Sequence, residues 1–223
     1  SSAASDVYKR QVIDFDMDTM KKNILKKTEV VDESFKESNY VSERIFAESH
    51  DGVKIPISIV RHVDTELNES TPLLLYGYGS YGITNDPRFS STRLSLLNRG
   101  FVYATAHIRG SEYYGRKWYE DGKLFKKKNT FFDFVACAKH LININYTSPE
   151  SIYAMGGSAG GLLMGAVLNL EPTLFNGVIS AVPFVDVMTT MLDETIPLTT
   201  LEYDEWGNPN EKAVSYTHLR AHE

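Results

Sequence analysis

The sequence is poor in cysteine, in net positive charge and in long apolar runs. Its 223 residues include one cysteine, Cys137, which excludes an internal disulfide framework and a multi-cysteine metal site. The formal net charge is -6 and the pI is about 5.6. Short lysine runs, such as residues 126–128, have no aromatic stacking platform, so they are interpreted as solvated faces. Together these features argue against a nucleic-acid partner.

No apolar run approaches the length of a membrane span, which is about 18 residues. The N-terminus also lacks the basic and then apolar order of a signal peptide. We therefore expect no membrane association and a cytoplasmic location. A hydrophobic content of 42% with 12% aromatic residues is enough for one substantial core. The sequence therefore indicates a globular protein.

Both ends of the chain resemble translated sequencing-adapter DNA. The segments concerned are residues 1–11 and 214–223, and we expect them to be artefacts outside the fold. On this interpretation residues 12–213 are an internal piece of a longer protein. His218 and His222 would then have no function.

The most informative stretch is residues 151–170. Four apolar residues, 152–155, precede Gly-Gly-Ser-Ala-Gly at 156–160, and apolar residues recur at helical spacing behind it. A Gly-x-Ser-x-Gly pattern between a strand and a helix is typical of a nucleophile elbow, where glycines let the strand and helix approach each other. The pattern predicts Ser158 as a nucleophile and the N–H of Ala159 as a donor to a developing oxyanion. The alternative is a glycine-rich loop that contains a serine by chance.

Apolar patterning predicts the elements around this elbow. Period-two alternation predicts a hairpin at residues 13–28, at the edge of a sheet, and a second hairpin at residues 40–60 that turns at Asp51-Gly52. Residues 29–39 between them are polar and irregular, as in a linker. The later elements are strand 73–76, helix 91–98, strand 101–106, a helix after 130, strand 152–155, helix 161–170 and strand 177–182. This order implies an α/β fold, a mainly parallel sheet with helices on both faces.

Residues 130–133, Thr-Phe-Phe-Asp, are predicted to cap the N-terminus of the helix that follows. Apolar residues of this helix share one face: Phe131, Phe134, Val135, Ala138, Leu141 and Ile142. Cys137 is expected in the same helix beside apolar neighbours.

Short motifs occur in a fixed order through nearly all of residues 12–213. They are residues 75–82, 107–110, 118–123, 129–131, 146–149 and 156–161. In order and sequence they resemble the prolyl oligopeptidase family of serine peptidases, and most closely its oligopeptidase B (protease II) group. The resemblance implies an α/β-hydrolase peptidase domain over residues 41–213, preceded at 12–40 by the last strands of a β-propeller and a linker. It also implies short peptide substrates and no metal or cofactor.

The resemblance assigns roles to two further groups beside the elbow. Ser158 matches the family nucleophile, which forms an acyl-enzyme. Tyr78 matches the residue whose hydroxyl completes the oxyanion hole with the Ala159 N–H. The alternative for Tyr78 is a packed aromatic residue at the end of a strand.

Acidic residues match the family's contacts to basic substrates. Glu202 and Asp204 match the carboxylates that receive Arg or Lys at the P1 position of the peptide, with Asp204 replacing the usual glutamate. Asp86 matches an acid that contacts a basic P2 residue, whereas the second position of that site is Arg88 here. From the residues alone, a solvated acidic loop is an equal alternative for the cluster around Glu202.

A serine nucleophile needs a histidine base and an acid, and in α/β-hydrolases both follow the serine in sequence. The histidines His50, His62, His107 and His140 all precede Ser158, so they are expected in loops or the core. We therefore expect the triad Asp and His to lie outside this sequence. The alternatives to an oligopeptidase are an esterase or acylaminoacyl peptidase on the same fold, and a non-catalytic α/β-hydrolase-like binding protein.

Overall fold

The computed structural model describes residues 11–27, 29–30, 35–86, 88–197 and 199–211. The segments predicted to be artefacts lie outside the described residues, except for Gln11, the first residue of a strand. Among the described helices, none has the length and apolar character needed to cross a membrane.

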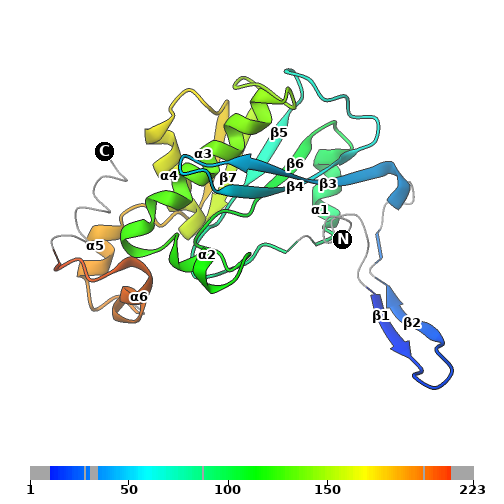
Figure 1. Cartoon of the computed structure of the whole chain (residues 1–223), viewed down its shortest axis with the longest axis horizontal. Coiled ribbons are helices and arrows are strands. Elements are labelled where there is room, and N and C mark those ends of the chain that lie inside the picture. The colour runs from blue at the N-terminus through cyan, green and yellow to red at the C-terminus, as the bar shows by residue number, and fades with distance from the viewer. Residues whose placement is uncertain (1–10, 28, 31–34, 87, 198, 212–223) are drawn as a thin grey trace.

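A six-stranded sheet forms the centre of the described chain, in the order β3-β4-β6-β5-β7-β8 (Figure 1). The strands are β3 (Tyr40–Glu48), β4 (Lys54–His62), β5 (Leu73–Tyr76), β6 (Val102–Ala106), β7 (Ile152–Gly157) and β8 (Gly177–Ala181). β3 and β4 form the second predicted hairpin, and β4 is antiparallel to β6. The pairs β6–β5, β5–β7 and β7–β8 are parallel, so the sheet is mainly parallel, as the sequence predicted.

Helices cover both faces of this sheet. They are α1 (Ser91–Leu97), α2 (Arg116–Glu120), α3 (Lys128–Asn143), α4 (Ala159–Leu170), α5 (Val187–Leu192) and α6 (Tyr203–Trp206), with 3₁₀ turns η2 (Glu37–Asn39), η3 (Leu124–Lys126) and η4 (Thr199–Glu202). Alternate residues of β6 show the two faces, because side chains of a strand alternate between them. Val102 and Ala104 pack in the cluster with α3 and α4, whereas Tyr103 packs with Leu94 and Leu97 of α1.

The main core lies between the sheet and the helices α3 and α4. The predicted apolar face of α3 contributes Phe131, Phe134, Val135, Ala138 and Leu141 to it, and Cys137 is buried among them. The apolar pattern of α3 therefore predicted its buried face correctly. β8 is the last strand in the order of the described sheet, so it has no strand on its outer side there. Ile179 on this strand is 50% exposed.

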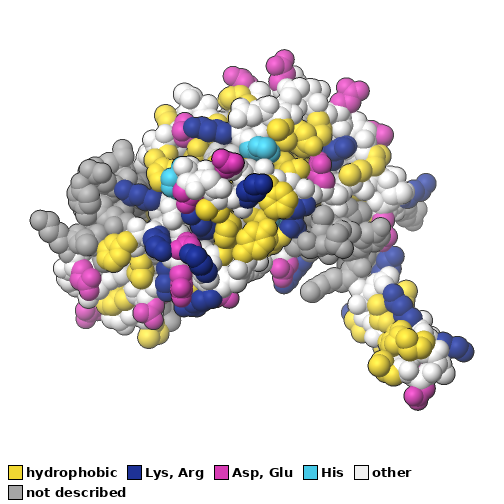
Figure 2. Space-filling model, viewed as in Figure 1, with side chains coloured by type: hydrophobic (Ala, Val, Ile, Leu, Met, Phe, Trp, Pro, Cys, Tyr) yellow, Lys and Arg dark blue, Asp and Glu magenta, His cyan; other side chains and the backbone are white. Residues whose placement is uncertain are grey.

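The first predicted hairpin forms, but in a different place from the one expected. β1 (Gln11–Phe15) and β2 (Lys22–Lys27) pair antiparallel, and the Asp16 carboxylate closes the turn by accepting from the N–H groups of Asp18 and Thr19. The hairpin is a separate two-stranded sheet that projects from the main body (Figure 1), so its prediction as a sheet edge was wrong. Exposed hydrophobic side chains cover it (Figure 2): Val12, Ile13, Phe15, Met17, Met20, Ile24 and Leu25.

The start of α3 also differs from the prediction. The helix begins at Lys128, and Thr130 is inside it, where its hydroxyl donates to the carbonyl oxygens of Arg109 (2.9 Å) and Gly122 (3.0 Å). Asp133 does not cap the helix, because its carboxylate is buried against Arg109. The pattern read as a local cap therefore makes tertiary hydrogen bonds instead.

Arg109 and Asp133 form a buried ion pair behind β6. The Asp133 carboxylate accepts from Nε (2.8 Å), Nη2 (2.6 Å) and the backbone N–H (3.1 Å) of Arg109, and from the Ser49 hydroxyl (2.6 Å). Asp51, in the turn between β3 and β4, accepts from Nη1 of Arg109 at 2.6 Å. Burial opposes the Arg109 charge, but hydrogen bonds to Asp133 and Asp51 outweigh it and raise the pKa of Arg109. The ion pair therefore links α3 to the loop after β6 and, through Asp51, to the turn between β3 and β4.

Replacing Asp133 by Asn should lower the free energy of unfolding by about 3 to 5 kcal/mol, because Arg109 would lose half of its compensation while remaining buried. Urea denaturation followed by circular dichroism measures this change. The control is Asp64→Asn, an exposed carboxylate whose loss should change stability by less than about 0.5 kcal/mol. Equal effects of the two substitutions would contradict a structural role for the buried pair.

Candidate active site

Ser158 lies on the turn between β7 and α4, as the elbow motif predicted. Its backbone has φ 55° and ψ −116°, a conformation that costs a non-glycine residue about 1 to 3 kcal/mol. Hydrogen bonds hold it there: its N–H donates to the Ala181 carbonyl (2.9 Å), and its carbonyl accepts from the N–H groups of Gly161 (2.8 Å) and Phe184 (3.0 Å). The Ser158 residue itself is exposed to solvent. The turn therefore presents the hydroxyl outward at a fixed place.

Two glycines of the motif allow α4 to approach the sheet closely. A Cβ atom on Gly156 would lie 2.2 Å from the Gly160 carbonyl oxygen. A Cβ atom on Gly160 would lie 2.8 Å from the Gly77 carbonyl oxygen and 3.4 Å from the Tyr78 ring. Neither position has room for a side chain, so the first turn of α4 packs directly on the loop that follows β5.

Tyr78 meets Ser158 because β5 and β7 are parallel neighbours, with Tyr76 paired to Met155. Both strands end at the same edge of the sheet, where ligands of open α/β sheets bind. Burial raises the pKa of Tyr78, and a hydrogen bond with the Ser158 side chain acts in the opposite direction without cancelling the rise. The Tyr78 hydroxyl is therefore protonated at neutral pH and able to donate. The Ala159 N–H is a second donor, since the first residue of a helix has no intrahelical partner for its N–H.

A cavity of about 290 Å³ opens beside Ser158. Tyr81 and Glu202 form one part of its wall, and residues 182–197 form another. The lining residues are Tyr81, Ser158, Val182, Pro183, Phe184, Thr190, Met191, Ile196, Pro197, Thr199 and Glu202. The cavity thus has a mixed lining of polar and apolar side chains, and Glu202 is the one carboxylate among the residues that line it.

The Glu202 carboxylate is held in a defined orientation. Its Oε2 atom accepts from the Tyr81 hydroxyl (2.9 Å) and from the indole Nε1 of Trp206 (3.2 Å). Trp206 also donates to the Tyr81 hydroxyl at 3.0 Å. Because both bonds to the carboxylate involve Oε2, Oε1 is the oxygen that we expect a cation entering the cavity to meet.

The other two predicted acidic residues lie elsewhere. Asp204 is exposed in α6 and does not line the cavity that contains Glu202. Asp86 is also exposed, and its nearest charged partner is Arg88, at 3.7 Å. The structure therefore brings Ser158, Tyr78, Ala159 and Glu202 together but leaves Asp204 and Asp86 outside this group.

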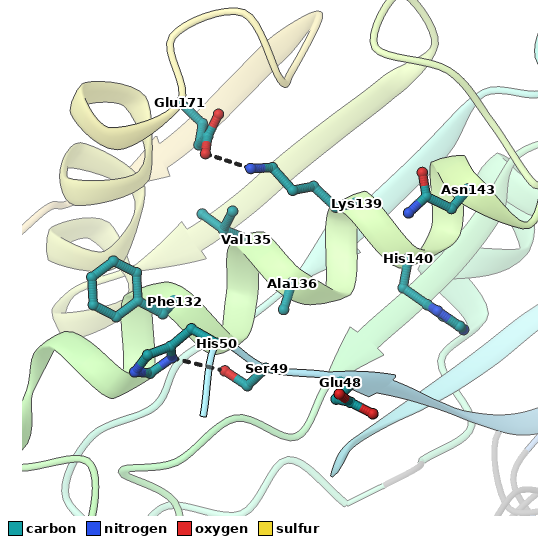
Figure 3. A pocket seen from close by; sticks show the side chains of 10 residues that line it. All are labelled: Glu48, Ser49, His50, Phe132, Val135, Ala136, Lys139, His140, Asn143 and Glu171. Carbon is teal, nitrogen blue, oxygen red and sulfur yellow. Dashed lines mark hydrogen bonds and ion pairs between the residues drawn. The ribbon is translucent and has the colours of Figure 1, made fainter. Parts of the chain in front are cut away.

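A larger hollow of about 450 Å³ lies along α3 and contains a serine next to a histidine (Figure 3). The Ser49 Oγ atom is 3.3 Å from Nδ1 of His50 but 2.6 Å from Asp133, to which it donates. His50 is therefore not placed to take the Ser49 proton. Lys139 of this hollow is paired with Glu171, so the hollow does not combine an accessible nucleophile with a base.

His50 lies in the turn after β3 and His107 is buried, but His62 ends β4 and His140 lies partly exposed on α3, so the expectation of loop or core placement was wrong for these two. None of the described histidines lines the cavity at Ser158. His107 is buried, with Nε2 2.7 Å from the Ser58 hydroxyl, and burial together with the charge of Arg44 lowers its pKa to about 3. His62 faces Asp64 at 3.5 Å on the surface. None of the described histidines is therefore placed to act as a base for Ser158.

Sequence reasoning did not single out Tyr81, Lys127, Glu205 or Trp206, which surround the candidate site. Lys127 was one of three consecutive lysines interpreted as a solvated face, yet it is only 2% exposed. Tyr81 lies three residues after Tyr78 in the motif 75–82, and this nearness to a candidate site residue was the available signal that Tyr81 belongs to the site. Nothing local distinguished the buried Glu205 from the exposed Asp204.

Comparisons with known proteins agree with this geometry. Residues 87–223 match the family model described as "Prolyl oligopeptidase family". The chain is 56% identical over 176 residues to dipeptidyl aminopeptidase BI of Pseudoxanthomonas mexicana, covering 78% of this chain and 24% of that protein. It is 54% identical over 185 residues to protease 2 of Moraxella lacunata, covering 83% of this chain and 27% of that protein. The chain thus spans about a quarter of the length of these curated relatives.

Solved structures give the same picture. Oligopeptidase B from Leishmania major superposes with a TM-score of 0.91 at 47% identity, covering 96% of this chain and 30% of that one. Oligopeptidase B from Trypanosoma brucei, solved in a closed form with covalently bound antipain, has a TM-score of 0.91 at 46% identity, covering 98% of this chain and 31% of that one. These two proteins therefore resemble the chain in sequence as well as in fold.

Gly160→Ala should destabilise the chain by about 1 to 3 kcal/mol, because the added methyl group would overpack the contact with Gly77 and Tyr78. The matched control is Gly165→Ala on the same helix, where the new Cβ would make an ordinary 3.4 Å contact with the Val185 side chain. That control should be neutral or stabilising by up to about 1 kcal/mol, since alanine favours helix. Urea denaturation of both variants measures the difference, and a tolerated Gly160→Ala would show that the close approach is not needed.

Proposed function

The chain belongs to the prolyl oligopeptidase family, and on this basis we propose that it forms part of the catalytic domain of a serine oligopeptidase that cleaves short peptides after Arg or Lys. The observation that carries the proposal is the pairing of Ser158, on a strained and exposed turn, with the hydroxyl of Tyr78. The separate β1–β2 hairpin supports assigning residues 12–40 to the end of a β-propeller and a linker, and residues 41–213 to the peptidase domain.

In the proposed reaction, the Ser158 hydroxyl attacks the carbonyl carbon of the peptide. The carbonyl oxygen becomes an oxyanion and receives hydrogen bonds from Tyr78 and from the Ala159 N–H. Collapse of this intermediate releases the amine product and leaves an acyl-enzyme, which water then hydrolyses. A histidine takes the Ser158 proton and returns it to the leaving amine, and an acid orients that histidine. We assign both to residues outside this sequence.

The proposed preference for Arg or Lys rests on Glu202. Its carboxylate lines the cavity beside Ser158, with one oxygen held by Tyr81 and Trp206. A guanidinium or ammonium group that enters the cavity would offset the charge of this half-buried carboxylate. Asp204 and Asp86 do not line the cavity, so we assign them at most an indirect part in recognising basic residues.

One observation favours a second candidate function on the same fold. The cavity lining includes apolar residues, among them Phe184, Met191 and Ile196. An esterase or acylaminoacyl peptidase would use such a lining for an apolar substrate group. Substrates with different P1 residues discriminate between the two candidates.

Tyr78→Phe should lower kcat by about a hundredfold or more, because it removes one of the two proposed oxyanion donors. The measurement requires the longer peptidase, made by extending the coding sequence until the triad Asp and His are included. Ser158→Ala in the same protein should abolish burst acylation and serves as the control for residual activity. A Tyr78→Phe enzyme with unchanged kcat would rule out this hydroxyl as a donor. The 223-residue chain alone should show no burst.

Glu202→Gln should reduce kcat/KM for peptides with Arg at P1 by about ten- to a hundredfold, because a hydrogen-bonded contact between charged groups contributes about 1.5 to 3 kcal/mol. Cleavage of a matched peptide with Leu at P1 should change little. Asp204→Asn is the neighbouring control and should leave both peptides nearly unaffected, since Asp204 is exposed outside the cavity. Equal cleavage of Arg and Leu peptides by the unaltered enzyme would replace the oligopeptidase B-like specificity with the esterase or acylaminoacyl alternative.

A further inference from the structure

Lys127 and Glu205 are buried charges with no direct part in the proposed reaction. Lys127, at the N-terminal end of α3, is 2% exposed, and Glu205, in α6, is 3% exposed. Burying a charge costs several kcal/mol unless hydrogen bonds and an opposite charge compensate for it. Groups on the loop of Tyr78 compensate part of each charge.

Lys127 is bonded to the residues that directly follow Tyr78. Its Nζ atom donates to the Gly79 carbonyl oxygen and to the Ser80 hydroxyl, each at 2.6 Å. The same loop is pressed against the first turn of α3, because a Cβ atom on Gly79, at φ +71°, would lie 2.4 Å from Cγ2 of Thr130. Lys127 therefore fixes the chain immediately beyond the proposed oxyanion donor.

Glu205 is bonded to the next part of the same loop. Its Oε1 atom accepts from the Tyr81 N–H at 3.0 Å and lies 3.9 Å from Nζ of Lys127, and its Oε2 atom accepts from the Tyr119 hydroxyl at 2.5 Å. Glu202, three residues earlier in the same segment, accepts from the Tyr81 hydroxyl. The Tyr78 loop and the Glu202 segment are thus joined through both acids.

We propose that Lys127 and Glu205 are a positioning pair that sets the Tyr78 hydroxyl and the Glu202 carboxylate relative to Ser158. The inference rests on the proposed function, because it takes Tyr78 as the oxyanion donor and Glu202 as the P1 contact. An oxyanion donor is effective only when it is in place before the charge develops, so the groups that hold its loop affect the rate. A Leu or Met side chain at residue 127 would fill the same volume but would not bond to Gly79 or Ser80.

The first test uses the longer peptidase and the Lys127→Met variant. Its kcat for a Leu peptide, which does not use Glu202, should fall by about tenfold or more, because the oxyanion forms with either substrate. The loss in kcat/KM for the Arg peptide should be at least as large, because Glu202 is displaced as well. Lys126→Met is the matched control: its neighbouring ammonium is exposed and paired with Asp121 at 2.7 Å, so kcat should stay within about twofold of the parent. A normal kcat in Lys127→Met would overturn the proposal.

Combination with Tyr78→Phe separates positioning from general damage. If Lys127 acts through the Tyr78 hydroxyl, removing the Lys127 ammonium should lower kcat little further in an enzyme that already lacks that hydroxyl. With the Leu peptide, the Lys127→Met/Tyr78→Phe double variant should therefore match Tyr78→Phe within about threefold in kcat. Multiplication of the two single losses would overturn the positioning role. Glu205→Gln, which keeps the shape and an acceptor for the Tyr81 N–H, gives the same comparison if Lys127→Met does not fold.

A second readout needs no catalysis and uses the 223-residue chain. With 3-fluorotyrosine at position 78, the parent and Lys126→Met should give the same single ¹⁹F resonance, whereas Lys127→Met should shift, broaden or split it. Leu141→Ala, a core substitution near the opposite end of α3, controls for lost stability and should leave the resonance in place. An unchanged resonance in Lys127→Met would overturn the proposal. A changed resonance together with an inactive longer protein would instead locate the failure in the proposed function.

Discussion

The close approach of α4 to the loop after β5 is the constraint on which the candidate site depends. Gly156 and Gly160 have no room for a Cβ atom, so the backbone of the Ser158 turn packs directly against the backbone of the Tyr78 loop. Without that approach, the exposed Ser158 hydroxyl would have the Ala159 N–H but not the Tyr78 hydroxyl beside it. The strained backbone of Ser158 is maintained by the hydrogen bonds that this packing permits.

The sequence predicted those features that depend on neighbouring residues. The Gly-x-Ser-x-Gly pattern placed Ser158 between β7 and α4, and the apolar spacing of α3 gave its buried face. The same local reasoning was wrong for Asp133, because a carboxylate near a helix start is equally suited to a cap and to a distant arginine. Which of these forms depends on Arg109, which lies on another element and cannot be placed by local spacing.

The acidic segment near Glu202 shows the same limit more sharply. Sequence resemblance selected Glu202 and Asp204 as a pair, but a short helical turn directs neighbouring side chains to different sides. Glu202 therefore lines the cavity, Asp204 faces solvent, and Glu205 is buried against Lys127. Neighbouring side chains of the lysine run at residues 126–128 also point to different sides, and Lys127 is the one that is buried.

Both buried cations make contacts at the start of helix α3. Lys127, directly before the helix, donates to the loop after β5, and Asp133, in its second turn, binds Arg109 of the loop after β6. The loops after β5 and β6 are therefore both bonded to the start of the same helix. The wall of the cavity formed by residues 182–197 has no ion pair of this kind among the described residues, and Val182 on it is 84% exposed. We therefore expect accommodation of differently sized substrate side chains to be one-sided, with the catalytic wall rigid and the opposite wall compliant.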